Sequence, residues 1–198
     1  MSDISFKKWN TILGWMCFLI AATVYALTAE PTVSFWDAGE YILSASKLNV
    51  GHPPGAPLFQ MLGAFFSIFA MEPSQIGYIM NLMSGISSAF TILFMFWSIS
   101  LFLSKVSSKI DLKKNNNFTI LTSSLVASLS FMFTDTFWFN AVETEVYAMA
   151  TLIMSVLFYL GLKWEQEMHL PRGNRWLILI SFIVGLSFGV HFMGLLTI

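Results

Sequence analysis

The sequence predicts an all-α, polytopic bundle of membrane-spanning helices, and its composition, its long charge-free runs and its charge distribution all point to this fold class. The 198 residues are 56% hydrophobic and only 11% charged, with a mean hydropathy of +0.71. A soluble domain does not carry so much apolar surface. Because backbone groups in hydrocarbon must be hydrogen-bonded within their own segment, the apolar runs are predicted to be helices.

The first apolar run covers residues 9–29 and follows Lys7 and Lys8. It is longer than the roughly 7–15-residue core of a secretory signal and has no clear small-x-small cleavage site. We therefore interpret it as a retained anchor that leaves the N-terminus in the cytoplasm. Cys17, the lone cysteine, excludes a disulfide framework and a cysteine metal site, and we expect it to be a small packing residue.

Residues 56–70 form the segment on which the topology depends. As a helix they would extend about 22 Å, which is short for a hydrocarbon core of roughly 30 Å. If they crossed the membrane, seven basic residues of the later loops would lie outside: Lys105, Lys109, Lys113, Lys114, Lys163, Arg172 and Arg175. Positive residues of short loops stay inside, so we expect 56–70 to be a re-entrant or interface-lying helix on the outer side.

Five membrane spans follow, and together they make residues 1–198 one transmembrane domain. We expect them at 9–29, 76–103, 118–138, 146–162 and 176–197. Nine of the ten Lys and Arg residues then lie inside and seven of the eleven Asp and Glu outside, where Lys47 is the only cation. The inner connectors 104–117 and 163–175 are expected to be solvated turns without a phosphate-binding loop. We therefore expect neither nucleotide hydrolysis there nor a nucleic-acid partner.

The first outer loop contains the first candidate site residues. In a helix through this loop, spacings of three and four place four polar side chains on one face: Asp37, Glu40, Tyr41 and Ser44. Trp36 and Lys47 fall on a neighbouring face, and His52 belongs to a proline-stiffened stretch before the short apolar helix. A solvated acid is the simpler interpretation of Asp37 alone, so a functional role for it depends on the other outer segments.

The turn between the third and fourth spans carries three carboxylates at membrane depth, Asp135, Glu143 and Glu145. Ionisable groups are costly there, which makes a functional interpretation the default. Glu143 and Tyr147 are expected to share a helical face, whereas Glu145 points elsewhere. Helix capping is the alternative role, and we favour it for Asp135 and Glu145. His191, among the glycines of the last span, is either a hydrogen-bonded packing residue or a member of the site.

Four motifs on the outer side follow one another along the chain: Phe-Trp-Asp-Ala-Gly-Glu-Tyr at 35–41, Gly-His-Pro-Pro-Gly at 51–55, Ala-Val-Glu-Thr-Glu-Val-Tyr at 141–147 and Gly-Val-His-Phe at 189–192. Together they resemble the N-terminal part of the transmembrane protein 260-like family, polytopic glycosyltransferases related to the protein O-mannosyltransferases of the GT-C superfamily. The resemblance implies a GT-C-like bundle with interfacial helices in the first outer loop. It also implies inverting transfer of a mannose-like sugar from a polyprenyl-phosphate donor to Ser or Thr hydroxyls of exported proteins.

The resemblance also implies a role for Asp37, the acid of the first outer loop, and the roles of the other candidate residues are our own assignments. Asp37 is expected to be the general base, and Glu40 the second catalytic residue, with a positioning role. The other candidates are expected to contact substrate: Trp36, Tyr41, Lys47, His52, Glu143, Glu145, Tyr147 and His191. We assign no metal ligand, although Asp37, Glu143 and His191 together would suit a divalent cation. Because the last span stops at Ile198 without a polar terminus, we expect the chain to be the N-terminal fragment of a larger enzyme.

Two non-enzymatic functions compete with a transferase, namely a carrier or ion pathway and a structural membrane subunit. A carrier would also place Asp, Glu and His at membrane depth beside glycine-interrupted helices. However, a carrier lines its cavity near the midplane of the membrane, and the acids of this chain are predicted at the outer edge. This difference favours an interfacial transferase.

Overall fold

The computed structural model describes residues 3–109 and 117–197, and within these ranges it is helical and contains no β-strand. The helices are α1 (Asp3–Thr28), α2 (Ala38–Lys47), α3 (Pro57–Ser67), α4 (Ile76–Lys109), α5 (Asn117–Met132), α6 (Asp135–Val142), α7 (Val146–Glu167) and α8 (Arg175–Ser187). Two short 3₁₀ helices complete the described chain, η1 (Pro73–Gln75) and η2 (Phe192–Thr197). The predicted all-α fold class is confirmed.

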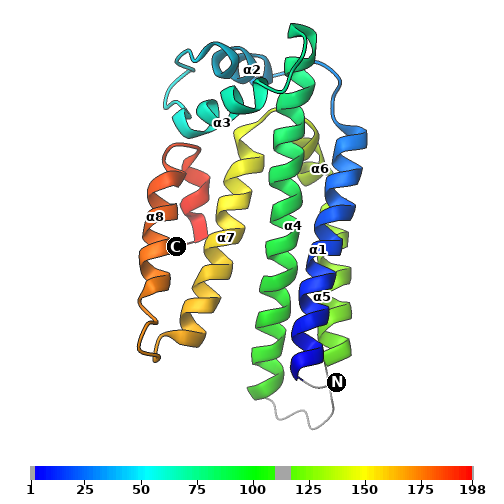
Figure 1. Ribbon diagram of the computed structural model, residues 1–198, viewed down its shortest axis with the longest axis vertical. Helices are drawn as coiled ribbons and strands as arrows, with labels where there is room; N and C mark the ends of the chain where they lie inside the picture. The colour runs from blue at the N-terminus through cyan, green and yellow to red at the C-terminus, as the bar shows by residue number, and fades with distance from the viewer. Residues whose placement is uncertain (1–2, 110–116, 198) are drawn as a thin grey trace.

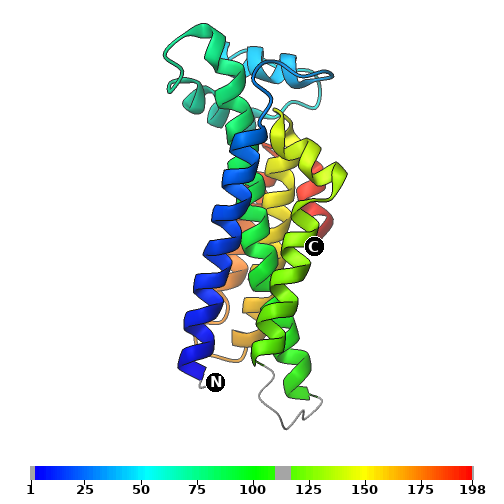
Figure 2. The ribbon, with the colours of Figure 1, turned by 90° about the vertical axis from the view of Figure 1, so that its right-hand side faces the viewer.

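Three helical stretches are long and apolar enough to cross a membrane, Ser5–Thr28, Pro73–Ser108 and Val146–Glu167. Helices α5 and α6 form a fourth candidate span as a pair, but they are bent by 65° at the break between them, as Figure 2 shows. The bend lies at Thr134, whose extended backbone (φ −69°, ψ 137°) interrupts the helix. By length and composition, the described residues therefore hold three or four candidate spans rather than the five expected.

The predicted fifth span, 176–197, is the one that differs most. Helix α8 ends at Ser187 after 13 residues, a length of about 20 Å that is short for a hydrocarbon core. The chain then reverses, and η2 runs back beside α7 (Figure 1). The turn after α8 lies against the start of α3, where the carbonyl oxygen of Gly189 accepts hydrogen bonds from the backbone N–H groups of Leu58 and Phe59.

Helix α4 is central, and it packs against α1 and α5 on one side and against α7 on the other (Figure 1). Helices α2 and α3 lie across one end of the bundle, together with segments 29–37 and 133–145. We call this the α2–α3 end. Helix α3 lies across the end of the bundle instead of running along it, which agrees with the expectation that residues 56–70 do not form a span. Its 11 residues pack beneath α2 and over the end of α4.

The opposite end of the bundle carries the N-terminus and the connection between α7 and α8 (Figure 1). Three ion pairs form there: Lys105–Glu165, Lys163–Glu167 and Arg175–Glu167. Lys113 and Lys114, which we also expect on this side, lie outside the described residues, whereas Lys47 lies at the α2–α3 end. The loops that we expect on the same side of the membrane therefore lie at the same end of the bundle, as the charge distribution predicts. Which end faces the cytoplasm remains a prediction from that distribution.

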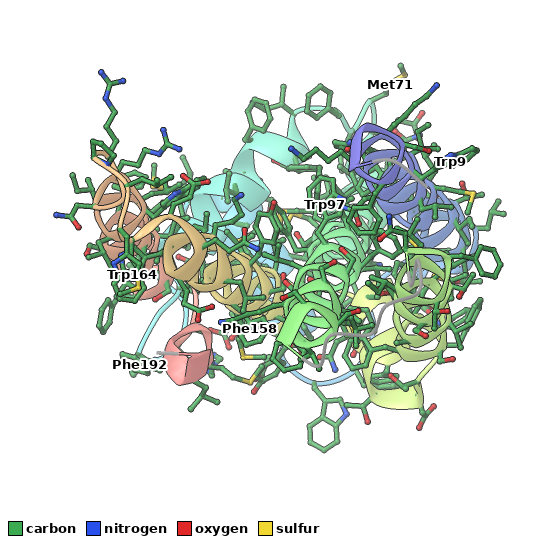
Figure 3. All side chains as sticks on the ribbon, turned by 90° about the horizontal axis from the view of Figure 1, so that it is seen from below. Trp9, Met71, Trp97, Phe158, Trp164 and Phe192 are labelled. Carbon is green, nitrogen blue, oxygen red and sulfur yellow. The ribbon has the colours of Figure 1, made fainter. Side chains whose placement is uncertain are left out.

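Two apolar clusters hold the helices together. The first joins α2 and α3 to α4 and α7: Tyr41, Phe59, Met80, Met83, Met149 and Val190. The second joins α1 to α4, α5 and α6: Cys17, Ala21, Tyr25, Phe96, Leu121 and Met132. Small residues let helices approach closely in lipid. Thus Gly14 leaves room for Trp97, whose indole points from α4 toward α1 and donates to the carbonyl oxygen of Asn10 at 3.2 Å (Figure 3).

Candidate functional site

Helix α2 begins at Ala38, so Asp37 is its N-cap residue and Trp36 precedes the helix. The side chain of Asp37 is exposed and makes no capping hydrogen bond. Trp36 is 86% exposed and has a left-handed backbone (φ 64°), which is strained for a bulky residue. The four residues expected on one helical face divide in the structure, because Tyr41 and Ser44 are buried whereas Asp37 and Glu40 remain exposed.

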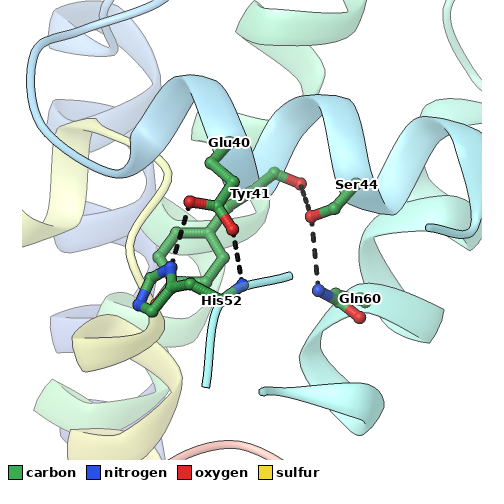
Figure 4. A network of polar contacts seen from close by, with 5 residues as sticks. All are labelled: Glu40, Tyr41, Ser44, His52 and Gln60. Carbon is green, nitrogen blue, oxygen red and sulfur yellow. Dashed lines mark hydrogen bonds and ion pairs between the residues drawn. The ribbon is translucent and has the colours of Figure 1, made fainter. Parts of the chain in front are cut away.

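Glu40 and His52 are brought together as two members of the predicted site (Figure 4). The backbone N–H of His52 donates to Oε1 of Glu40 at 2.6 Å, and the imidazole Nδ1 lies 3.0 Å from Oε2. The hydrogen bond from the His52 backbone, followed by the contact with its ring, lowers the pKa of Glu40. Glu40 therefore tethers the proline-rich segment to α2, which fits the positioning role expected of it.

A second polar contact closes the same loop, and the sequence analysis did not anticipate it. Gln60 of α3 is buried, and its side-chain amide lies 3.2 Å from Oγ of Ser44 (Figure 4). With its amide turned over, Gln60 also accepts from the backbone N–H of Gly51 at 3.1 Å and donates to the carbonyl oxygen of Asn49 at 3.3 Å. We prefer this orientation because it satisfies the loop backbone. A polar residue within an otherwise apolar short helix was the signal available for Gln60.

The acidic turn between α6 and α7 is extended rather than helical. Glu143 has φ −132° and ψ 164°, and Glu145, the N-cap residue of α7, has φ −136° and ψ 146°. The expectation that Glu143 and Tyr147 share a helical face is therefore corrected, because α7 begins only at Val146. The side chain of Glu145 makes no capping hydrogen bond, and Asp135 lies in the first turn of α6 after the N-cap residue Thr134.

Both glutamates of this turn are buried, and their charges act on the α2 residues. Burial raises the pKa of Glu145 to about 7, and the negative charge of Asp37 adds to the effect. Burial also raises the pKa of Tyr41 to about 12, with Glu145 and Asp37 as the largest charge contributions. Of the two buried glutamates, Glu145 is thus the one whose pKa the charge of Asp37 raises. The pKa of Glu143 is likewise raised, first by burial and further by the charge of Glu30.

Tyr147 and His191 form a neighbouring pair at the same end. Their rings lie 5.2 Å apart in an edge-on arrangement, and Nδ1 of His191 accepts from the backbone N–H of Met193 at 3.1 Å. His191 lies in the turn between α8 and η2 rather than within a span. Both interpretations of His191 keep support, because it is hydrogen-bonded and also contacts a predicted site residue.

Lys47 lies apart from the other candidate residues, and the expected ligands of a divalent cation do not come together in the described part of the chain. Lys47 lies in the last turn of α2, about 15 Å along the helix from Asp37. Within the described ranges, no three His, Cys, Asp or Glu side chains gather as metal ligands would. Asp37, Glu143 and His191 therefore do not form the divalent-cation site that their chemistry would suit.

An apolar cavity of about 450 Å³ lies next to Tyr147, between α4, α5, α6 and α7. Tyr147, Asn140, Phe137 and Thr134 line its end nearest the acidic turn. It adjoins a second cavity of about 370 Å³ farther along the bundle, because Phe131 and Thr151 line both cavities. Taken together, the two cavities extend from Tyr147 along α4 and α7, and we call them the cavity path.

Comparison of the sequence with known proteins shows the family to which the chain belongs. Residues 37–198 match the family model described as the Protein O-mannosyl-transferase TMEM260 N-terminal domain. The chain belongs to this family. It is 28% identical over 178 residues to Protein O-mannosyl-transferase tmem260 of Dictyostelium discoideum, covering 88% of this chain and 20% of that protein. It is 26% identical over 170 residues to Protein O-mannosyl-transferase TMEM260 of Mus musculus, covering 86% and 22%.

The chain thus spans about a fifth of the length of the curated relatives it matches. No solved structure matches it. The family match begins at Asp37, and therefore includes the candidate base, the loop of His52, the acidic turn and His191. The resemblance stated from the four motifs is confirmed.

Proposed function

We propose that this chain contributes the reaction site of a membrane glycosyltransferase that transfers a mannose-like sugar from polyprenyl phosphate to a Ser or Thr hydroxyl of an exported protein. The observation that carries the proposal is the family match over residues 37–198, which includes Asp37, Glu40, Glu143 and Glu145. The relatives that the chain matches are named protein O-mannosyl-transferases.

The acids Asp37, Glu40 and Glu145 are suited to different tasks. Glu40 is occupied by two contacts with His52, and Glu145 is buried with a pKa raised to about 7. Asp37 remains exposed at the start of α2 and makes no capping bond there. It is therefore the carboxylate available to an incoming hydroxyl. We assign it as the general base that takes the hydroxyl proton while the new bond to the anomeric carbon forms and the bond to phosphate breaks.

The cavity path supports a lipid-linked donor. A sugar carried on a polyprenyl chain needs an apolar path that ends where the reacting phosphate sits, and the two adjoining cavities end beside Tyr147. Tyr147 contacts His191, and His52 lies on Glu40. We therefore assign the imidazoles of His52 and His191 to contacts with the leaving phosphate, which needs positive charge or hydrogen-bond donors.

The same proposal places the α2–α3 end outside the cytoplasm, because the basic residues gather at the other end. Single cysteines at Asn49, Asn140 and Asn174, in a chain with Cys17 replaced by Ala, test the orientation. A membrane-impermeant thiol reagent applied from the outer side should label the first two and spare Asn174. Labelling of Asn174 from that side would overturn the orientation.

Asp37→Asn in membranes containing the full-length protein tests the chemistry. Loss of a general base lowers the rate by about 10²–10⁴-fold, so transfer from a radiolabelled polyprenyl-phosphate mannose to a Ser/Thr-rich acceptor should fall by that factor at unchanged abundance. Asp135→Asn, an exposed acid at the same end, is the matched control and should transfer normally. Glu40→Gln should fall less than Asp37→Asn. Near-normal transfer by Asp37→Asn would overturn the assignment.

A further inference from the structure

Asn81 is a fully buried amide in the first third of α4, a predominantly apolar helix. Burying an amide in a membrane-spanning helix is costly unless its donors and acceptor are all paired. This cost indicates that the hydrogen bonds of Asn81 have a structural or functional role. Asn81 was not among the residues predicted from the sequence.

The side chain of Asn81 joins two segments that are distant in the chain. Its Nδ2 donates to the carbonyl oxygens of Glu30 at 2.7 Å and Thr32 at 2.9 Å. Its Oδ1 accepts from Oγ1 of Thr144, which is also fully buried, at 2.5 Å. Both amide hydrogens and the carbonyl oxygen are therefore used. One backbone bond, from the N–H of Glu30 to the carbonyl oxygen of Val142 at 2.9 Å, supports the same junction.

Each segment that Asn81 holds carries an acid of the candidate site. The first runs from Thr32 to Asp37, and the second places Thr144 between Glu143 and Glu145. The first segment also lies tightly on α4, since a Cβ at Gly77 would come within 3.2 Å of the carbonyl oxygen of Thr32. Asn81 and Thr144 therefore join the start of the segment that leads to Asp37 to the turn that carries the buried carboxylates.

We propose that Asn81 and Thr144 are positioning residues of the transfer reaction, which hold Asp37 in register with Glu145 without touching substrate. This inference rests on the function proposed above. A misplacement of about 1 Å far from the chemistry can cost about 10²-fold in rate. Loosening the junction should therefore lower turnover although no substrate contact is removed.

Two variants and two controls separate positioning from general stability. Asn81→Leu removes all three bonds at similar size, and Thr144→Val removes one donor at nearly equal shape. Thr144→Ser keeps the hydroxyl and should restore the wild-type behaviour. Ser84→Ala is the matched control on α4, because Ser84 is buried and its hydroxyl has no hydrogen-bond partner within the described chain.

The first readout is the distance between spin labels at Val33 and Phe139, two exposed residues of the joined segments, with Cys17 replaced by Ala. We expect one narrow distribution in the parent, Ser84→Ala and Thr144→Ser proteins, and a broadened one in Asn81→Leu and Thr144→Val. The second readout is transfer in the full-length protein, where kcat should fall about 10–100-fold in the two variants, with the KM for the polyprenyl-phosphate sugar unchanged.

The outcomes are distinct. Narrow distributions in both variants would overturn the junction, and broadened distributions with normal kcat would overturn its positioning role. A lowered yield of folded protein with normal kcat per folded molecule would leave a purely structural junction and also overturn the proposal. If the parent protein itself transfers no sugar, the proposed function fails, and the positioning role fails with it. Should Asn81→Leu not fold, Thr144→Val against Thr144→Ser decides the question.

Discussion

The backbone N–H of Leu58 donates a 2.7 Å hydrogen bond to the carbonyl oxygen of Gly189. The first N–H groups of a helix have no partner within it, so the turn after α8 supplies one for the first turn of α3. The two segments approach so closely that a Cβ at Gly189 would lie 2.8 Å from the Cβ of Leu58. This contact keeps α3 across the bundle end and brings His191 to the candidate site.

Gly189→Ala should therefore destabilise the α2–α3 end. Overpacking of a tight contact costs about 1–3 kcal/mol, and the added methyl group has backbone and Leu58 on the side it would occupy. Thermal unfolding in detergent should show a lowered midpoint. Gly185→Ala is the control, because a Cβ there meets nothing within 4 Å. Equal midpoints for the two variants would contradict the role given to Gly189.

The contact between Glu40 and His52 should weaken in acid. Because the pKa of Glu40 is lowered in the folded protein, its contribution is fully present above the usual value of 4.5 and is lost as the pH falls through the lowered value. The protection of the His52 amide against hydrogen exchange should fall over that range towards the level of Glu40→Ala, in which the side-chain acceptor is absent at every pH. An amide equally protected in both proteins at pH 7 would refute the tether.

Glu145 predicts the opposite pH dependence. Its pKa is raised from 4.5 to about 7, so its ionisation destabilises the folded protein as the pH rises from near 4.5 through about 7. Glu145→Gln should remove this loss and stabilise the protein at pH 8 by roughly 1–3 kcal/mol, since one pKa unit corresponds to about 1.4 kcal/mol. Unfolding midpoints at pH 5 and pH 8 measure it, with Asp135→Asn as control. Parallel curves for wild type and Glu145→Gln would exclude a buried, ionising Glu145.

The cavity path predicts a dependence on the length of the donor lipid. Thr151 lines both cavities, and its hydroxyl bonds only within its own helix, to the carbonyl oxygens of Tyr147 and Ala148. Thr151→Phe should fill the path at its junction and raise the KM for a long-chain polyprenyl-phosphate sugar about 10-fold or more, the equivalent of about 1.4 kcal/mol. A short-chain donor should be affected less. Thr119→Phe, at an exposed position, is the control. Equal effects of Thr151→Phe on the KM for the long-chain and the short-chain donor would exclude the path.

Hydropathy and charge were sufficient for the fold class and the shared ends of the loops, but they did not find the breaks in the helices. Residues 118–138 and 176–197 read as continuous apolar runs. The structure bends the first at Thr134 and reverses the second after Ser187. Both breaks depend on contacts with other helices, as Gly189 shows with Leu58, and such contacts leave no periodic signal along the chain.

The candidate site shows the same division. Motif order along the sequence pointed to Asp37, Glu40, His52, Glu145, Tyr147 and His191, and the structure places these at the α2–α3 end. Lys47 lies at the same end but in the last turn of α2, away from Asp37. Asn81, Thr144 and Gln60 escaped the sequence reading because a lone amide or hydroxyl in an apolar run resembles an ordinary packing residue. Their partners are mainly backbone atoms of remote segments.

The sequence by itself determined that this protein is a helical membrane protein, which loops share a side, and which acids lie together on that side. These properties depend on the free energy of placing each stretch in hydrocarbon or water, which is nearly additive along the chain. The tertiary structure alone decided which carboxylates are buried, which of them has its pKa raised by the charge of Asp37, and which hydrogen bonds hold the loops together. Those outcomes depend on desolvation and on hydrogen bonds between distant segments, so they exist only once the helices have packed.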